Sequence, residues 1–294
     1  MNITDYIDLC PEAYEVYRDT LNAVGENSEF KNLGKMIADG APFGEIAKNC
    51  ADTAEKLGTD KYALNMTVLF ANLNIAVERW EKSGTDMRIF KDTAEDFLYK
   101  IAECKKVYGV WGIEPFAWYE HLFNARLFKL GRLQFQQQGG DIYIHIPSCG
   151  PLDHGGVIDS YKKAFGFFGK KHGDVLTLHC GSYLLFPPYK GTAFAEGTNI
   201  YRFVDDFEVL KVNYTDGFND AWRIFGCAYD GDSAKLPAET SMQKAFVSYI
   251  NNGGKFGTAL GVLRFDGEKL CKYKKINKKY TIFQKTLAKM RKLV

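Results

Sequence analysis

The first half of the chain consists of amphipathic stretches of helical length, most of them followed by a glycine. Apolar residues recur in them at helical spacing, as Leu64, Val68 and Ile75 do. Glycine just past a helix accepts the left-handed conformation at low cost, so it marks a helix end. The stretches that we predict as helices are 11–24, 28–39, 42–57, 59–83, 85–108 and 114–138. The pattern therefore predicts an all-helical domain over residues 1–139.

Residue types at the start of these stretches agree with that prediction. Pro11 and Pro42 stand where the first turn of a helix tolerates a missing N–H. Thr59 and Thr85 are suitable N-cap residues. In the sixth stretch four leucines recur at helical spacing: Leu122, Leu127, Leu130 and Leu133.

After Gly139 the pattern changes to short segments of alternating apolar and polar residues. The predicted strands are 141–147, 175–186, 207–214, 221–227 and 257–265, and helices are predicted at 154–169, 198–206 and 240–252. Strands interleaved with helices indicate a mixed α/β domain, here over residues 140–267. The sixth predicted helix runs almost directly into the first strand. We therefore expect an α+β fold in which the helical domain is docked on the second domain.

Two of the predicted strands run into a histidine near their carboxyl ends. His145 follows the alternating residues of 141–144, and His179 follows those of 174–178. In open α/β sheets, ligand crevices form at the carboxyl ends of strands. The pKa of histidine lies near neutrality, so both are candidates for general acid–base chemistry. The alternative is that both are hydrogen-bonded histidines on a partly buried face of a sheet.

The sequence signals for a metal site or for further catalytic residues near these strands are weaker. Cys149 and Cys180 could ligate zinc together with the two histidines, but His179 and Cys180 are adjacent and point to opposite faces of a strand. We therefore expect no metal. Tyr183 is a candidate acid that follows the second strand, and Glu239 is a further base candidate.

A capping box is predicted at the start of the helix over 240–252. Thr240 is its N-cap, and Gln243 follows three residues later. The box fits a well-capped structural helix, and it also fits an anion site, because backbone N–H groups point out of that end. Thr240, Ser241 and Gln243 are the residues that we predict to contact an anionic cofactor.

Composition argues against a secreted protein and against a membrane-spanning one. The 294 residues carry a net charge of +2, and the N-terminus lacks the features of a secretory signal. No apolar run approaches the roughly 18 residues that span a bilayer. Seven scattered cysteines indicate reduced thiols and a cytoplasmic protein. We therefore expect no membrane partner.

The tail over residues 268–294 is strongly basic, with ten lysine and arginine residues against Glu268. It could bind an anionic surface or nucleic acid. Alternatively it forms a solvated terminal strand and helix, with Ile282, Phe283 and Leu287 packed inward. The near-neutral charge of the whole chain favours the second interpretation, so a nucleic-acid partner is not expected.

Several sequence blocks occur in the order typical of one known family. They include Phe128-Lys-Leu-Gly-Arg-Leu-Gln-Phe, Ile144-His-Ile-Pro-Ser-Cys-Gly-Pro-Leu, Leu178-His-Cys-Gly-Ser-Tyr-Leu-Leu, Trp222-Arg-Ile-Phe-Gly and Leu236-Pro-Ala-Glu-Thr-Ser-Met-Gln-Lys-Ala. In these blocks the chain resembles the two-domain bacterial acyltransferase-domain family, whose helical N-terminal domain precedes a C-terminal domain similar to GNAT N-acyltransferases.

The resemblance implies transfer of an acyl group from acyl-CoA to the amine of a small molecule. A base would deprotonate the amine and an acid would protonate the leaving thiolate, which are the roles considered for His145, His179, Glu239 and Tyr183. The usual pyrophosphate signature of GNAT enzymes, Gln or Arg-x-x-Gly-x-Gly/Ala, is absent from this chain. The alternative is therefore a non-catalytic protein that binds a small metabolite or a partner on the same fold.

Overall fold

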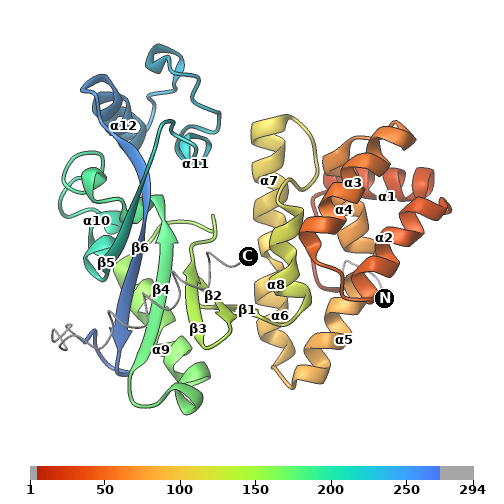
Figure 1. The fold of residues 1–294 in the computed structure, drawn as a ribbon, viewed down its shortest axis with the longest axis horizontal. Coiled ribbons are helices and arrows are strands. Elements are labelled where there is room, and N and C mark those ends of the chain that lie inside the picture. The colour runs from red at the N-terminus through yellow and green to blue at the C-terminus, as the bar shows by residue number, and fades with distance from the viewer. Residues whose placement is uncertain (1–4, 272–294) are drawn as a thin grey trace, which may run out of the picture.

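The structure is a computed structural model that describes residues 5–271, apart from the side chains of 170–172, with helices in its first part and a sheet in its second (Figure 1). The first part contains α1 (Pro11–Val24), α2 (Ser28–Ala38), α3 (Phe43–Leu57), α4 (Lys61–Ala71), α5 (Leu73–Ser83), α6 (Met87–Ala94) and α7 (Asp96–Tyr108). The predicted α+β class, with a helical N-terminal part, is confirmed. Most of the predicted basic tail, residues 272–294, lies outside the described residues.

Two of the predicted helices are each divided in the structure. The stretch 59–83 forms α4 and α5, which part at Asn72, and 85–108 forms α6 and α7, which part at Glu95. The N-caps of α4 and α6 are Asp60 and Asp86, so the prediction of Thr59 and Thr85 was wrong by one residue. The aspartate side chains accept the free N–H groups of the first turn.

The prediction of one helix over 114–138 was wrong. This stretch forms the short helices η2 (Phe116–Tyr119) and α8 (Glu120–Phe123), followed by strands β1 (Leu127–Leu130) and β2 (Leu133–Gln138). Gly131 turns the chain between the strands with a φ of 79°. The spacing of the leucines matched a helix, but Leu127, Leu130 and Leu133 are buried residues of a β-hairpin formed by β1 and β2. Both strands thus precede residue 139, where the helical domain was expected to end.

The sheet has six strands in the order β1-β2-β3-β4-β6-β5. The other four strands are β3 (Asp141–His145), β4 (Leu176–Ser182), β5 (Glu208–Thr215) and β6 (Phe256–Phe265). All neighbours are antiparallel except β3 and β4, which are parallel. The second part also contains helices α9 (His154–His172), α10 (Asn199–Asp205), α11 (Ala221–Phe225) and α12 (Ser241–Asn251).

The strand predicted at 221–227 is the short helix α11, so that prediction was wrong. Its residues have strand-forming types, but Ala221, Ile224 and Phe225 are buried at helical spacing. Gly226 ends the helix in the left-handed conformation, with a φ of 72°. Burial of these side chains on one side of a helical turn outweighs their β propensity.

The two faces of the sheet differ. One is apolar and packs on α9, for example through Phe135 against Phe168 and through Phe265 against Tyr161. The other carries polar side chains of β2, β3 and β4, and residues of η2 and α8 contact it at β2 and β3. The residues that connect the first part to the sheet therefore meet its polar face.

Candidate functional site

The sheet splits between its two parallel strands. Tyr143 on β3 and His179 on β4 form the one registered pair between these strands. Beyond that pair β3 continues with β2 as far as His145, whereas β4 continues with β6 as far as Ser182. We call the diverging carboxyl ends of β3 and β4, from His145 and from Cys180 onward, the fork. Such a point in an α/β sheet is where ligands bind.

Both predicted histidines lie on the polar face at the fork. Tyr143 is paired with His179, and β-strand side chains alternate, so His145, Tyr143 and His179 share one face. His179 lies at the closed end of the fork and His145 at its open end. On β4, the residue in register with His145 would be Gly181, and a Cβ there would meet no described atom within 4 Å. The structure thus places the two histidines on one face of the sheet, with open space at the Gly181 position.

His145 is held by side chains from the first part and from β2. Its Nε2 lies 2.7 Å from Oε1 of Gln136. The Gln136 amide nitrogen lies 3.2 Å from Nε2 of His121 on α8. The ring of Trp118 on η2 meets that of His145 edge-on, with centroids 4.6 Å apart. Trp118 in turn donates from Nε1 to Asp96, a carboxylate buried at the start of α7.

Burial controls the charges in this cluster. Burial, together with the smaller effects of the nearby His121 and Lys100, lowers the pKa of His145 to about 4. The pKa of His121 is also lowered by burial, while burial raises that of the Asp96 carboxyl. Lys100 lies 2.8 Å from Glu103 on the same helix. His145 is therefore a neutral imidazole at physiological pH.

His179 has a different environment. Its Nε2 lies 3.7 Å from the Asp141 carboxylate, and its ring lies 5.5 Å from that of Tyr143. Burial lowers the pKa of His179, and the Asp141 carboxylate opposes that effect. Among the described residues no hydrogen bond joins His179 to His145. The two histidines share a face but belong to separate clusters.

Tyr183 lies just beyond β4, in the short helix η3 (Tyr183–Leu185). Burial raises the pKa of its hydroxyl, while the positive charge of Arg223 on α11 opposes that effect. Tyr183 therefore keeps its proton at neutral pH, as an acid must. The structure places it on the β4 side of the fork.

The start of α12 is arranged as the sequence predicted, although the structure leaves its anion-binding role a prediction. The capping box is present, with Gln243 N–H donating to Thr240 Oγ1 at 3.2 Å. The buried Gln243 side chain accepts from the N–H groups of Glu239 and Thr240 and donates to Ile224 O. Glu239, Thr240 and Ser241 are exposed, and among the described residues no hydrogen bond or ion pair joins them to either histidine.

A loop leads from β3 into α9 and is held in place by one arginine. The guanidinium of Arg132, in the β1–β2 turn, donates to the carbonyl oxygens of Pro147, Gly150 and Pro151, at 2.9, 2.6 and 2.9 Å. A glycine-containing loop from a strand into a helix N-terminus is the arrangement that binds phosphate groups. In α9 the N-cap Asp153 already accepts from Gly156 N–H at 2.8 Å.

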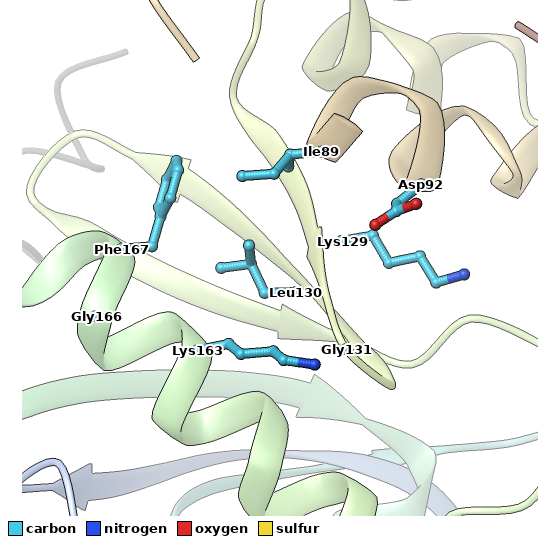
Figure 2. A pocket seen from close by; sticks show the side chains of 8 residues that line it. All are labelled: Ile89, Asp92, Lys129, Leu130, Gly131, Lys163, Gly166 and Phe167. Atoms are coloured by element: carbon cyan, nitrogen blue, oxygen red, sulfur yellow. The ribbon is translucent and has the colours of Figure 1, made fainter. Parts of the chain in front are cut away.

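A surface hollow of about 430 Å³ lies between α6, β1 and α9 (Figure 2). Ile89, Leu130 and Phe167 supply its apolar side chains. Its two lysines are both paired, Lys129 with Glu95 and Lys163 with Asp159. None of the residues that line this hollow belongs to the fork, so we do not assign the candidate site to it.

The described residues contain no group of three or more histidine, cysteine, aspartate or glutamate side chains that could hold a metal ion. All seven cysteines are free thiols. None of the helices in residues 5–271 combines the length and the apolar composition that crossing a membrane requires.

Comparison with known proteins identifies the class of fold and then the family. The N-acyltransferase N-terminal domain family matches residues 2–125, and the GNAT-like C-terminal domain family matches residues 127–263. The chain is thus a two-domain protein with a GNAT-like sheet domain. It belongs to the two-domain acyltransferase family in which these domains are joined. A search among curated proteins gave no match.

Solved structures support the fold. An acyltransferase in complex with decanoyl-CoA and teicoplanin is 20% identical, with a TM-score of 0.60 over 68% of this chain. An acyltransferase in complex with decanoyl-CoA is 24% identical, with a TM-score of 0.58 over 69% of this chain. The chain spans 65% of the length of each of these structures.

The sequence did not reveal the side chains that surround His145. Gln136 and Trp118 lie in the stretch that was predicted as one helix, and Asp96 lies within another predicted helix. One signal for Gln136 was available, because Leu133-Gln-Phe-Gln alternates with period two directly after a glycine turn. Nothing in the sequence indicates that Trp118 or Asp96 packs beside β3.

Proposed function

We propose that this protein is an acyl-CoA-dependent N-acyltransferase that acts on a small-molecule amine at the fork. The proposal is supported chiefly by the parting of β3 and β4 with His145 on the polar face at the open end. Family membership supports the same class of reaction. The solved relatives in complex with decanoyl-CoA support a thioester as the acyl donor.

In this proposal the amine nitrogen attacks the thioester carbonyl carbon, and the bond from that carbon to sulfur breaks. His145 accepts the proton that the nitrogen loses, and Tyr183 donates a proton to the leaving thiolate. A base with a pKa of about 4 removes a proton poorly from an ammonium group. The amine must therefore arrive neutral and lose its proton only after it has attacked. His179 and Glu239 are further base candidates.

For the phosphate groups of acyl-CoA two helix starts are available. The first turn of α9 follows the fork along the chain, although its Gly156 N–H already donates to the Asp153 carboxylate, which opposes an anion there. The start of α12, with Thr240, Ser241 and Gln243, is the second candidate. A reducing cytoplasmic location, expected from the seven cysteines, belongs to this proposal as well.

The Asp153 carboxylate favours a second candidate function. A negative side chain hydrogen-bonded to the first turn of α9 suits a protein that has lost its pyrophosphate site. The protein would then bind a small metabolite at the fork without catalysing acyl transfer.

Thermal-shift measurements with CoA, acetyl-CoA and decanoyl-CoA, followed by thiol-release assays with a panel of amines, separate the two functions. We expect acyl-CoA to raise the melting temperature and to release CoA thiol when a suitable amine is present. His145→Ala should abolish thiol release while the acyl-CoA shift remains. If no acyl-CoA raises the melting temperature, the acyltransferase proposal fails.

A further inference from the structure

The hydrogen bond between Gln136 and His145 has a direction that can be assigned. The Gln136 amide nitrogen points to His121 and also lies 3.4 Å from Oε1 of Gln138, an atom that can only accept. Its amide oxygen therefore faces His145, at 2.7 Å from Nε2. Because an amide oxygen cannot donate, the proton of this bond must lie on Nε2 of His145.

The other ring nitrogen of His145 is then the basic one. A neutral imidazole carries one proton, so with Nε2 protonated the lone pair is on Nδ1. Among the described residues none hydrogen-bonds Nδ1. The edge-on contact of Trp118 and its hydrogen bond to Asp96 restrain the ring plane from the side of the first domain.

We propose that Gln136 is a positioning residue that holds His145 in the Nε2–H tautomer and thereby makes Nδ1 the nitrogen that accepts the proton of the substrate amine. The tautomer follows from the hydrogen bonds alone, whereas the catalytic use of Nδ1 rests on the proposed function. Gln136 acts through His145 and does not itself touch the substrate.

The charged groups around His145 are consistent with a neutral ring. His121 on α8 and Lys100 on α7 both disfavour a second proton on His145. Lys100 is paired with Glu103, and the Asp96 carboxylate bonds Trp118 instead of His145. Within the described residues no carboxylate hydrogen-bonds His145, so the neutral side chain of Gln136 is what sets the tautomer.

The tautomer can be read directly by NMR on protein labelled with ¹⁵N in the histidine rings, at pH 7.5. We expect Nε2 of His145 to show the shift of a protonated nitrogen and Nδ1 that of an unprotonated one. Gln136→Leu should give a mixture of both tautomers. Gln137→Leu is the matched control, because the side chain next to Gln136 points to the opposite face, and it should leave the His145 signals unchanged.

Activity gives a second and separate readout. Gln136→Leu should lower kcat roughly 10- to 100-fold with little change in the KM for acyl-CoA, as loss of a group that orients a functional histidine does. Gln136→Glu should keep the tautomer but move the acidic limb of the kcat profile to higher pH, because a carboxylate raises the pKa of His145.

The outcomes distinguish the inference from the function on which it rests. A wild-type His145 protonated on Nδ1, or a tautomer that Gln136→Leu leaves unchanged, would overturn the inference. A tautomer that responds to Gln136→Leu in a protein without acyl transfer would confirm the role of Gln136 in positioning His145 and refute the acyltransferase proposal. If Gln136→Leu does not fold, the tautomer of His145 in the wild type and the pH profile of kcat for Gln136→Glu still test the inference.

Discussion

At the scale of single residues, His145 shows what burial between two domains does to an imidazole. The ring has one strong hydrogen bond, to a neutral amide, and an aromatic neighbour that offers no acceptor to a second N–H. Protonation would place a charge beside Lys100 and His121. The folded protein therefore binds this proton far less tightly than the unfolded chain does.

This difference predicts a pH-dependent stability. In the unfolded chain His145 takes up its proton near pH 6.5, but in the folded protein only near pH 4. Between these values the unfolded state binds more protons, so the free energy of unfolding falls as the pH is lowered. From the difference in pKa, we expect His145 to contribute a loss on the order of 3 kcal/mol between pH 7 and pH 4.

Urea denaturation at pH 4.5, 5.5, 6.5 and 7.5 measures this slope. His145→Gln should show a shallower decline than the wild type. Part of the decline should remain, because His121 and His179 also have lowered pKa values. A variant that loses stability as steeply as the wild type would show that His145 does not cause the slope.

At the scale of elements, the start of α9 combines favourable and unfavourable features for an anion. Its position after β3 and its glycines suit a phosphate group, whereas the Asp153 carboxylate already accepts from Gly156 N–H. An asparagine at the N-cap accepts the same hydrogen bond without the negative charge. The two effects can thus be separated by a single substitution.

We expect Asp153→Asn to tighten the binding of CoA, if the phosphate groups bind at α9, by about 2- to 5-fold at low salt, which corresponds to the usual energy of one charge at a helix terminus. Isothermal titration calorimetry measures the change. Asp60→Asn is the matched control, because Asp60 caps α4 in the helical part. Equal affinity of the wild type and Asp153→Asn would exclude the start of α9 and leave α12 as the candidate.

The sequence predicted most elements of this fold from local signals. The capping box of α12 and the bounds of α1 could be predicted because the determining residues lie within a few positions of each other. The helix predicted over 114–138 failed because leucine spacing fits both a helix and a buried hairpin. The strand predicted at 221–227 was wrong for the converse reason, because side chains of strand-forming types are packed there as the short helix α11.

The site was predictable only in part. His145 and His179 could be placed on one sheet edge from the alternation of their strands, and the structure shows them on one face. Their partners could not be predicted, because Gln136 and Trp118 reach His145 through tertiary packing. Whether Glu239 and the start of α12 take part stays a prediction.

At the scale of the whole molecule, the two parts share one apolar core. Phe128 on β1 is buried and contacts Trp80 of α5 on one side and Phe167 and Phe168 of α9 on the other. A hydrogen bond also joins the backbone of β1 to α6, because Lys129 N–H donates to Thr93 Oγ1 at 2.9 Å. These contacts predict that the parts unfold together.

Differential scanning calorimetry should therefore show a single transition. Phe128→Ala should destabilise the protein by about 3–5 kcal/mol and lower that transition without dividing it, because the cavity lies in a core that both parts share. Lys211→Ala, at an exposed position of the edge strand β5, is the control and should change stability by no more than about 0.5 kcal/mol. Two separate transitions in the wild type would contradict this prediction.

The split in the sheet also bears on the order in which the chain can fold. The β1–β2–β3 side of the fork consists of consecutive strands with short turns, whereas β4 must pair with β6, whose residue Phe265 lies roughly ninety positions after its partner Leu176. During synthesis one side of the fork can form while β6 is still unmade. The chain thus completes the β4 side, and with it any site at the fork, only when residue 265 has left the ribosome.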